Sequence, residues 1–298
     1  MKKYTVITGI AILIIIVFIY KYSVYVKKFV VKHFNGKEWV DKSRRDTLNG
    51  LNRIYDKNGT LLFEGYFIDG KREGEYKTFY PDGSIKAKSF YKGDTLEGEA
   101  VLYYENGNMA SHYNFENGKQ KGVGKEFYKN NVLQNESLFS SGVLNGPMKA
   151  YNEKGQLILE ENYTNGLLEK EAKEFYDSGA LHSVYYYKNG KLDGRSVSYW
   201  EDGSIKVTQE YKDDKLLDAN GKPFEGKYEI SYPDGQLESV TEYKDGLAQG
   251  KAKVFYPNRQ LQWAIELKDG KRHGKTIKYN QSGQIESEEN YQNDVLLE

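Results

Sequence analysis

Apolar and aromatic residues recur along this chain with a period of 24 residues. Each copy opens on a leading position. Nine of the ten copies have an aromatic residue five positions on, with Ser231 as the exception, and seven have a second aromatic directly after that position. The leading position holds Gly50, Gly74, Gly98, Gly122, Gly146, Lys170, Gly194 and Asp218, and after an eight-residue insertion Gly226, Gly250 and Gly274. A fixed period of this length predicts one supersecondary unit, copied about ten times after residue 49.

Each copy contains a turn followed by a second apolar segment. Many turns carry Asn-Gly or Asp-Gly, as at residues 58–59 and 82–83, and these dipeptides supply the positive φ that tight hairpins need. An aliphatic residue stands two positions past the turn glycine and an aromatic six positions further on, as in Ile85 and Tyr91. This even spacing puts both side chains on one face of a strand. The pattern therefore predicts a two-stranded antiparallel hairpin in every copy.

Successive hairpins are expected to pair edge to edge, because a lone hairpin is not stable in water. The predicted fold is all-β: an elongated, open antiparallel β-hairpin array in which the aliphatic and aromatic positions of neighbours form a continuous core strip. An N-terminal transmembrane helix precedes it. Lys170 and Asp218 replace leading glycines, Asn131 and Arg259 replace turn glycines, and the insertion at 218–225 is expected to form a longer loop.

The second aromatic of each copy is the candidate partner-binding position. If the first aromatic faces the core strip, the second points to the opposite face of the strand and forms a ladder there. The ladder consists of Tyr80, Tyr104, Tyr128, Tyr176, Trp200, Tyr232 and Tyr256. Such a row suits a groove that binds a protein, and it equally suits cross-strand packing that stabilises the sheet. Both interpretations remain open.

Residues 1–49 carry no copy of the repeat. An apolar run over 5–26 is 22 residues long, enough at about 1.5 Å per residue to cross a hydrocarbon core of roughly 30 Å. A cleaved signal peptide needs small residues after its apolar core, whereas Tyr20, Lys21 and Tyr22 stand there. We therefore predict a single-pass membrane anchor at 1–26, a juxtamembrane segment and N-cap at 27–49, and a repeat domain at 50–298. Lysines on both sides of the run leave the side of the membrane undecided.

The amino-acid composition argues against several classes of function. Lys plus Arg and Asp plus Glu both number 43, so the formal net charge is zero, which argues against non-specific nucleic-acid binding. Cysteine is absent, which excludes disulfides and thiolate metal sites. The four histidines form no metal-like pair with carboxylates, and the chain has neither a P-loop nor a nucleophile elbow. We predict no enzyme activity, no cofactor, no metal and no small-molecule substrate.

Two segments carry a resemblance to a known repeat. They are F-Y-P-D-G-S-I-K at residues 79–86 and Y-W-E-D-G-S-I-K at residues 199–206. The unit resembles the MORN repeat variant, and bacterial arrays of that repeat are grouped with the YwqK-type toxin–antitoxin antitoxin family. The resemblance covers residues 50–297. It implies an open β array that acts as a scaffold, binding proteins or lying against membranes, with no catalytic residues.

The sequence thus favours a non-catalytic, membrane-anchored scaffold that binds a protein partner, with an antitoxin-like, toxin-binding role as its narrower form. Two alternatives belong to other classes. One is a structural envelope spacer that works through the length of the array. The other is a lipid-associating module that uses the basic residues of segment 27–32.

Overall fold

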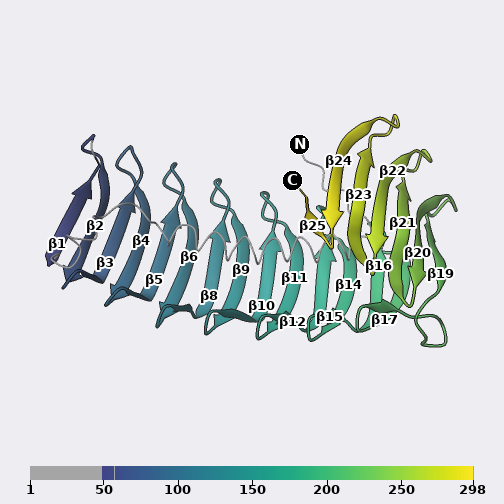
Figure 1. Cartoon of the computed structure of the whole chain (residues 1–298), viewed down its shortest axis with the longest axis horizontal. Helices are drawn as coiled ribbons and strands as arrows, with labels where there is room; N and C mark the ends of the chain where they lie inside the picture. Colours follow the sequence, from purple (N-terminus) through teal and green to yellow (C-terminus); the bar gives the residue numbers. More distant parts are fainter. Residues whose placement is uncertain (1–48, 57, 298) are drawn as a thin grey trace. The chain divides into compact units, whose positions relative to one another are not determined.

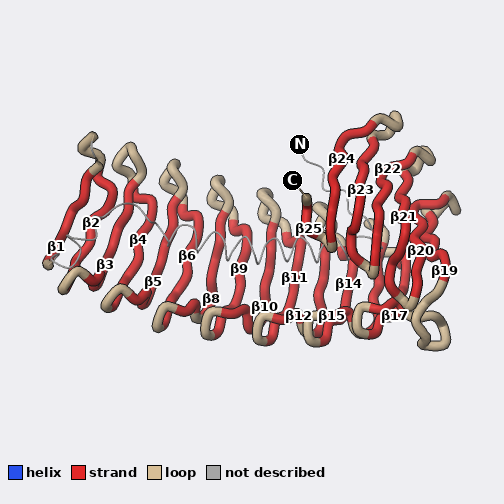
Figure 2. The backbone as a smooth tube through the Cα atoms, in the orientation of Figure 1, coloured by secondary structure: helices blue, strands red, loops and turns tan. Residues whose placement is uncertain are grey.

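A computed structural model of the chain describes residues 49–56 and 58–297. Their regular secondary structure is β-strand (Figure 1), and short turns join the strands (Figure 2). None of these residues belongs to a helix long and apolar enough to span a membrane. The anchor predicted at 1–26 and the juxtamembrane segment, up to residue 48, lie outside the described residues.

The described residues divide into two compact units. The first unit contains the residues up to 191 together with 199–205, and the second unit contains 192–198 and 206–297. Strands β15 (Lys191–Leu192), β16 (Gly194–Tyr199) and β17 (Ile205–Lys212) have residues in both units.

The first unit otherwise holds the strands β1 (Gly50–Tyr55), β2 (Leu61–Ile68), β3 (Lys71–Phe79), β4 (Ile85–Lys92), β5 (Thr95–Tyr103), β6 (Met109–Glu116), β7 (Lys119–Gln120), β8 (Gly122–Phe127), β9 (Leu133–Ser140), β10 (Val143–Tyr151), β11 (Leu157–Thr164), β12 (Leu167–Leu168), β13 (Lys170–Phe175) and β14 (Leu181–Lys188). The second holds β18 (Lys215–Leu216), β19 (Gly226–Ser231), β20 (Leu237–Lys244), β21 (Leu247–Phe255), β22 (Leu261–Lys268), β23 (Lys271–Tyr279), β24 (Ile285–Gln292) and β25 (Val295–Leu296). Strands β19 to β25 form a seven-stranded sheet in chain order.

Nine hairpins share the same antiparallel register. The leading position pairs with the aromatic or aliphatic residue near the end of the second strand, as in Gly74 with Tyr91, Gly122 with Phe139 and Gly250 with Leu267. A register shift then follows at the first aromatic, as between Thr78 and Phe79. The predicted open antiparallel hairpin repeat is confirmed for the described residues.

The turns confirm the role assigned to the Asn-Gly and Asp-Gly dipeptides. The Tyr80 amide donates to the Ser84 carbonyl at 2.8 Å, and the Gly83 amide donates back to the Tyr80 carbonyl at 2.9 Å. Gly83 has a φ of 84°. Where glycine is replaced, Asn131 and Arg259 adopt φ values of 66° and 67°. The backbone therefore keeps the left-handed geometry even where the residue is a poor fit for it.

The core of the first unit is a row of inner aromatics, one from each hairpin. We call the face that carries them the inner face and the opposite face of the strands the outer face. The row consists of Phe67, Tyr91, Phe115, Phe139, Tyr163 and Tyr187, all buried. Rings of this row pack edge to face against other aromatic rings, as Tyr91 does against Tyr76 at 5.7 Å, the geometry that aromatic pairs prefer. The predicted aromatic half of the core strip is thus present.

The aliphatic half of the predicted strip differs from expectation. Its residues are half-buried or exposed, with Ile205 and Ile285 as exposed as 60% and 57%. The reason is the register shift, which falls opposite the aliphatic position, as where Phe79 pairs with Ile85. A β-bulge redirects side chains locally, so the simple alternation assumed from the even spacing does not extend to this residue.

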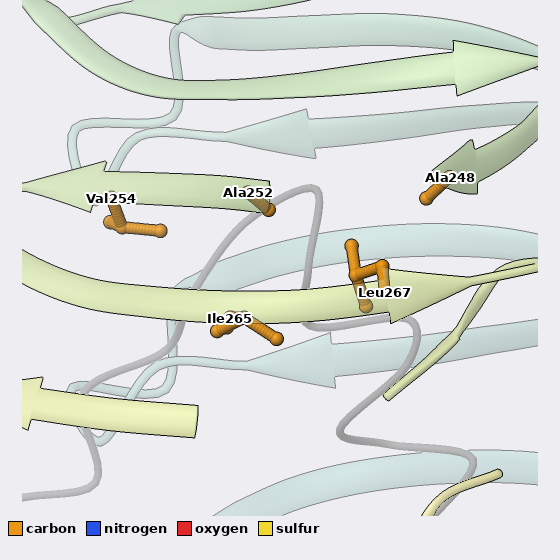
Figure 3. Packing of buried hydrophobic residues seen from close by; sticks show 5 residues of the cluster. All are labelled: Ala248, Ala252, Val254, Ile265 and Leu267. Atoms are coloured by element: carbon orange, nitrogen blue, oxygen red, sulfur yellow. The ribbon is translucent and has the colours of Figure 1, made fainter. Parts of the chain in front are cut away.

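The second unit has a core of its own. It is formed by Ala248, Ala252, Val254, Ile265 and Leu267 on strands β21 and β22 (Figure 3). The insertion at 218–225 forms a turn closed by a bond from the Asp218 amide to the Lys222 carbonyl at 2.7 Å. Phe224, at the end of this loop, packs its ring against Tyr228 and Tyr243 at 5.5 and 6.0 Å. The insertion is a loop, as expected, and it also contributes a side chain to the packing.

Candidate functional site

The second aromatics do not lie on a strand. Strand β3 ends at Phe79, and Tyr80 opens the turn that follows it. The predicted ladder position on the opposite strand face is therefore replaced by a row at the turns. Six hydroxyls of this row each donate to the backbone carbonyl of the first aromatic in the next copy. The bonds run from Tyr80 to Tyr103, Tyr104 to Phe127, Tyr128 to Tyr151, Tyr176 to Tyr199, Tyr232 to Phe255 and Tyr256 to Tyr279, at 2.7 to 2.9 Å.

These tyrosines are half-buried, and two of their rings lie beside the residue at the register shift of their own hairpin. Tyr176 meets the ring of His182 edge to face at 4.6 Å, and the Lys86 ammonium lies 5.8 Å from the Tyr80 ring centre. Burial raises the pKa of Tyr232 to about 12, with Glu238 and Asp234 adding to the shift. Each of these tyrosines thus joins one copy to the next through its hydroxyl hydrogen bond, which we call a tyrosine tie. Trp200 occupies the same position without a hydroxyl.

A cluster of buried polar side chains lies on the inner face of the first unit. The Tyr163 hydroxyl donates to Glu161 at 2.6 Å, and burial raises the pKa of the Glu161 carboxyl to about 7. Close by in sequence, His182 Nδ1 lies 2.7 Å from the Ser183 hydroxyl and 3.3 Å from Glu174.

Serine, histidine and glutamate together invite comparison with a hydrolytic triad. In such a triad one imidazole nitrogen faces the nucleophile and the other faces the acid. Here Nδ1 of His182 faces both Ser183 and Glu174. Ser183 is also fully buried, so a substrate does not reach its hydroxyl. The cluster acts as a satisfied polar network in the core. Among the described residues, no group of three or more potential ligands is placed to hold a metal ion.

The outer face carries a second repeated feature, which we call the glycine bulge. Between the pairs Gly65–Tyr76 and Phe67–Arg72, the single residue Tyr66 of β2 faces the three residues 73–75 of β3. One copy later, Phe90 faces residues 97–99 between the pairs Ser89–Ala100 and Tyr91–Leu96.

The leading glycine sits at the centre of each bulge. Gly74 and Gly98 have φ values of 73° and 82°, a region that favours glycine. A Cβ on Gly74 would meet nothing within 4 Å, and one on Gly98 would lie 3.8 Å from Cβ of Phe90. The space above both glycines is therefore open.

Two hollows form at these bulges. One, of about 580 Å³, is lined by Phe90, Glu97, Gly98, Glu99, Asn114, Phe115, Glu116 and Lys121. The other, of about 370 Å³, is lined by Leu51, Glu64, Tyr66, Glu73, Gly74, Glu75 and Lys77. Each lining contains an exposed aromatic ring, three carboxylates and one ammonium group. The sequence signal for them is Glu-Gly-Glu at 73–75 and 97–99, with an aromatic eight residues before each glycine. Without the strand pairing, this signal indicates no site.

Two carboxylates are held in place by the backbone. Glu73 accepts a hydrogen bond from the Gly93 amide, and Glu97 accepts one from the Asn117 amide, both at 2.8 Å. On the far side of each glycine, Glu75 pairs with Lys77 at 2.5 Å, and Glu99 lies 3.7 Å from His112. The third carboxylate of each hollow is ion-paired, Glu64 with Arg53 at 2.6 Å and Glu116 with Lys121 at 2.8 Å. Each hollow thus keeps an acidic excess, which includes one carboxylate that a backbone amide holds in place.

The outer face of the second unit has a different chemistry. At the positions that Glu75 and Phe90 occupy in the first unit, Lys227 pairs with Glu242 and Lys251 with Glu266. Their charged groups lie 4.0 and 3.7 Å apart. At Gly274 the bulge is filled, because a Cβ there would lie 2.2 Å from a Glu266 oxygen. The open aromatic hollows are therefore a feature of the first unit's early copies.

The fold and the repeated register define the class of protein as an open antiparallel hairpin repeat. The model of the MORN repeat variant matches segments 48–69, 72–92, 96–117, 144–165, 168–189, 192–213, 224–245 and 272–293. These segments make up more than half of the chain, and the chain belongs to the MORN repeat variant family. The copies that begin at Gly122 and Gly250 lie outside the matched segments, yet they form hairpins in the same register.

Several solved structures are similar over part of their length. The TcdB2-TccC3 structure is 12% identical, with 77% of this chain and 14% of that chain covered and a TM-score of 0.20. The Photorhabdus luminescens Tc holotoxin pore is 13% identical, with 82% and 15% covered and a TM-score of 0.18. S. aureus TarM is 15% identical, with 55% and 27% covered and a TM-score of 0.19. The chain thus spans a minor part of each of these chains. No curated relative matches it.

Proposed function

We propose that this MORN repeat chain is a non-catalytic scaffold that binds a protein partner on the outer face of the first unit. The observation that carries the proposal is the concentration of exposed apolar side chains there. Leu51, Tyr66, Phe90, Val123 and Tyr186 occupy outer positions and are exposed, where the second unit has ion-paired lysines and glutamates. Exposed aromatic and aliphatic side chains gathered on one face are typical of protein interfaces.

The proposal includes the anchor predicted at 1–26, which would tether the scaffold to a membrane. Its test is fractionation of cells that produce the full chain, with sequencing of the mature N-terminus. Recovery of an intact N-terminus in the membrane fraction supports the anchor, and a mature chain that begins after residue 20 overturns it. An antitoxin-like role is the narrower form of the proposal, in which the partner is a toxin.

The binding surface is tested by affinity capture with the full chain and two matched variants. Phe90→Lys places a charge in a proposed contact, and Ile285→Lys places the same charge on an exposed residue of the second unit. We expect a stoichiometric partner with the wild type and Ile285→Lys that is lost with Phe90→Lys. Equal recovery with all three proteins would contradict the proposed surface.

The row of second aromatics is the other candidate contact surface, and Trp200 separates its two roles. Because an indole has no hydroxyl, Trp200→Ala removes ring surface without removing a tyrosine tie. If Trp200→Ala abolishes capture and Phe90→Lys does not, the partner binds the row at the turns.

The tyrosine ties favour a second candidate function, the structural spacer. A tie at most junctions stiffens an array whose stability comes from neighbour contacts. A spacer would tolerate Phe90→Lys and would respond to deletion of whole 24-residue copies.

A further inference from the structure

The two hollows of the first unit repeat one chemistry at a fixed distance. Each places carboxylates on both sides of an open glycine and an exposed ring beside it: Tyr66 is 49% exposed and Phe90 41% exposed. Strands β3 and β5 carry the two glycines, and β4 pairs with both. Two strand spacings of about 4.8 Å put the hollows about 10 Å apart.

The residues that line the two hollows favour a cationic ligand. An ammonium or guanidinium group beside an aromatic face is attracted by the ring, and the carboxylates add direct charge and hydrogen bonding. Glu73 and Glu97 are already positioned by the Gly93 and Asn117 amides, so binding does not have to order them. Glu99, with its exposed side chain, faces the same hollow as Glu97. An anionic lipid surface would instead be repelled by these carboxylates.

The distance between the two hollows favours one backbone conformation of a bound segment. In a polyproline II helix, residues three apart point to the same side and lie about 9.3 Å apart. In a β-strand, same-side residues are about 6.8 or 13.6 Å apart. The first geometry matches two hollows about 10 Å apart and the second does not.

We propose that the hollows at Gly74 and Gly98 bind two lysine or arginine side chains, three residues apart, of a partner segment in the polyproline II conformation. This inference rests on the proposed function and names the partner's chemistry. The segment runs across the strands of the first unit, with one cationic side chain over Tyr66 and the next over Phe90. A lysine that enters the Gly74 hollow competes with Lys77 for Glu75, whereas the Gly98 hollow offers Glu97 and Glu99 together.

The test uses the full chain and fluorescent proline-rich peptides of equal length and equal arginine content. Each peptide carries the same number of arginines, which are spaced two, three or four residues apart. A peptide with glutamates spaced three residues apart is the charge control. Binding is followed by anisotropy at low and moderate salt. We expect the period-three arginine peptide to bind about fivefold or more tightly than the other arginine peptides, and to weaken with salt.

Two double variants locate the site. Glu97→Gln with Glu99→Gln is expected to weaken binding of the period-three peptide by about tenfold, since it removes two charge-assisted contacts. Glu242→Gln with Glu266→Gln makes the same charge change in the second unit and is expected to leave the affinity unchanged. Phe90→Leu tests the ring and is expected to weaken binding several-fold.

Equal binding of all arginine peptides, or equal weakening by both double variants, would overturn the inference. So would binding to vesicles of anionic lipid that strengthens on Glu97→Gln with Glu99→Gln, because a lipid surface would then be the ligand of this face. If the captured partner depends on Phe90 while no arginine peptide binds, the surface stands and the cationic partner is wrong. If neither is seen, the proposed function fails as well.

Discussion

The hydroxyl of Tyr128 donates a hydrogen bond of 2.9 Å to the backbone carbonyl of Tyr151, in the next copy of the repeat. The bond satisfies a carbonyl at the end of β10 and joins two hairpins at their turns. A neutral hydrogen bond of this kind contributes about 1 kcal/mol. Tyr128→Phe is therefore expected to lower the free energy of unfolding by about that amount.

Urea denaturation followed by circular dichroism measures this effect. Tyr66→Phe is the matched control, because that ring lies half-exposed on the outer face. An unfolding midpoint equally displaced in both variants would show that the hydroxyl of Tyr128 has no special role.

Lys170 stands at a leading position and keeps the left-handed backbone of the glycines it replaces, with a φ of 67°. A side chain in this region costs roughly 1 to 2 kcal/mol. We expect Lys170→Gly to stabilise the chain by about 1 kcal/mol, the strain relief less the added entropy of the unfolded glycine. Thermal and urea unfolding measure it.

The control is Lys173→Gly, three residues on in the same strand β13. Glycine there has no strain to relieve and weakens the strand by about 0.5 to 1 kcal/mol. A loss of stability in Lys170→Gly would contradict the assignment of strain to this position.

Glu161 is 2% exposed, and its pKa rises from an ordinary 4.5 to about 7 mainly because of burial. The Tyr163 hydroxyl counteracts the rise and the Glu174 charge adds to it. The folded state therefore favours the protonated acid. The stability from this group is present below pH 4.5 and is lost as the pH rises towards 7, a change of about 3 kcal/mol.

Glu161→Gln mimics the protonated acid and is expected to remove this pH dependence of the free energy of unfolding. The stability of the variant relative to the wild type therefore rises between pH 5 and pH 8. Glu160→Gln is the control on the adjacent residue, whose carboxylate pairs with Lys149 at 2.8 Å. Parallel pH profiles for the wild type and Glu161→Gln would contradict the assignment.

Ile265 and Ile285 are the same residue type in different surroundings of the second unit. Ile265 is in the core cluster with Ala252 and Val254, whereas Ile285 is exposed. Ile265→Ala is expected to cost about 3 kcal/mol through lost burial and the cavity left behind. Ile285→Ala is expected to cost under about 1 kcal/mol. Chemical denaturation of both variants measures the contrast, and similar losses would contradict the placement of the core.

The hairpins and the inner aromatics were predictable from the sequence, because a strict period and turn dipeptides such as Asp82-Gly83 fix them locally. The buried row that contains Tyr91 and Tyr163 follows from that period. The exposure of Ile285 did not follow, because the register shift opposite it depends on how two strands pair. The position of Tyr80 did not follow either, since the strand ends one residue earlier than simple alternation assumes.

The acidic hollows could not be predicted from the sequence, for a different reason. In the sequence, Glu73 and Glu75 are two charged residues around a leading glycine, Gly74, and only the pairing of β2 with β3 shows that all three face Tyr66. The repeat conserves the bulge geometry, while the side chains that surround it differ from copy to copy. Function specific to this chain is therefore best sought at positions that the repeat leaves free.

The central claim is that a protein partner binds the outer face of the first unit, and photo-crosslinking in cells tests it most directly. A photoreactive amino acid replaces Phe90 in one full-length protein and Glu266 in another, so that equivalent outer positions of the two units are compared. The account predicts a discrete crosslinked protein from position 90 and none from position 266. Crosslinks of equal yield from both positions, or none from position 90, would contradict it.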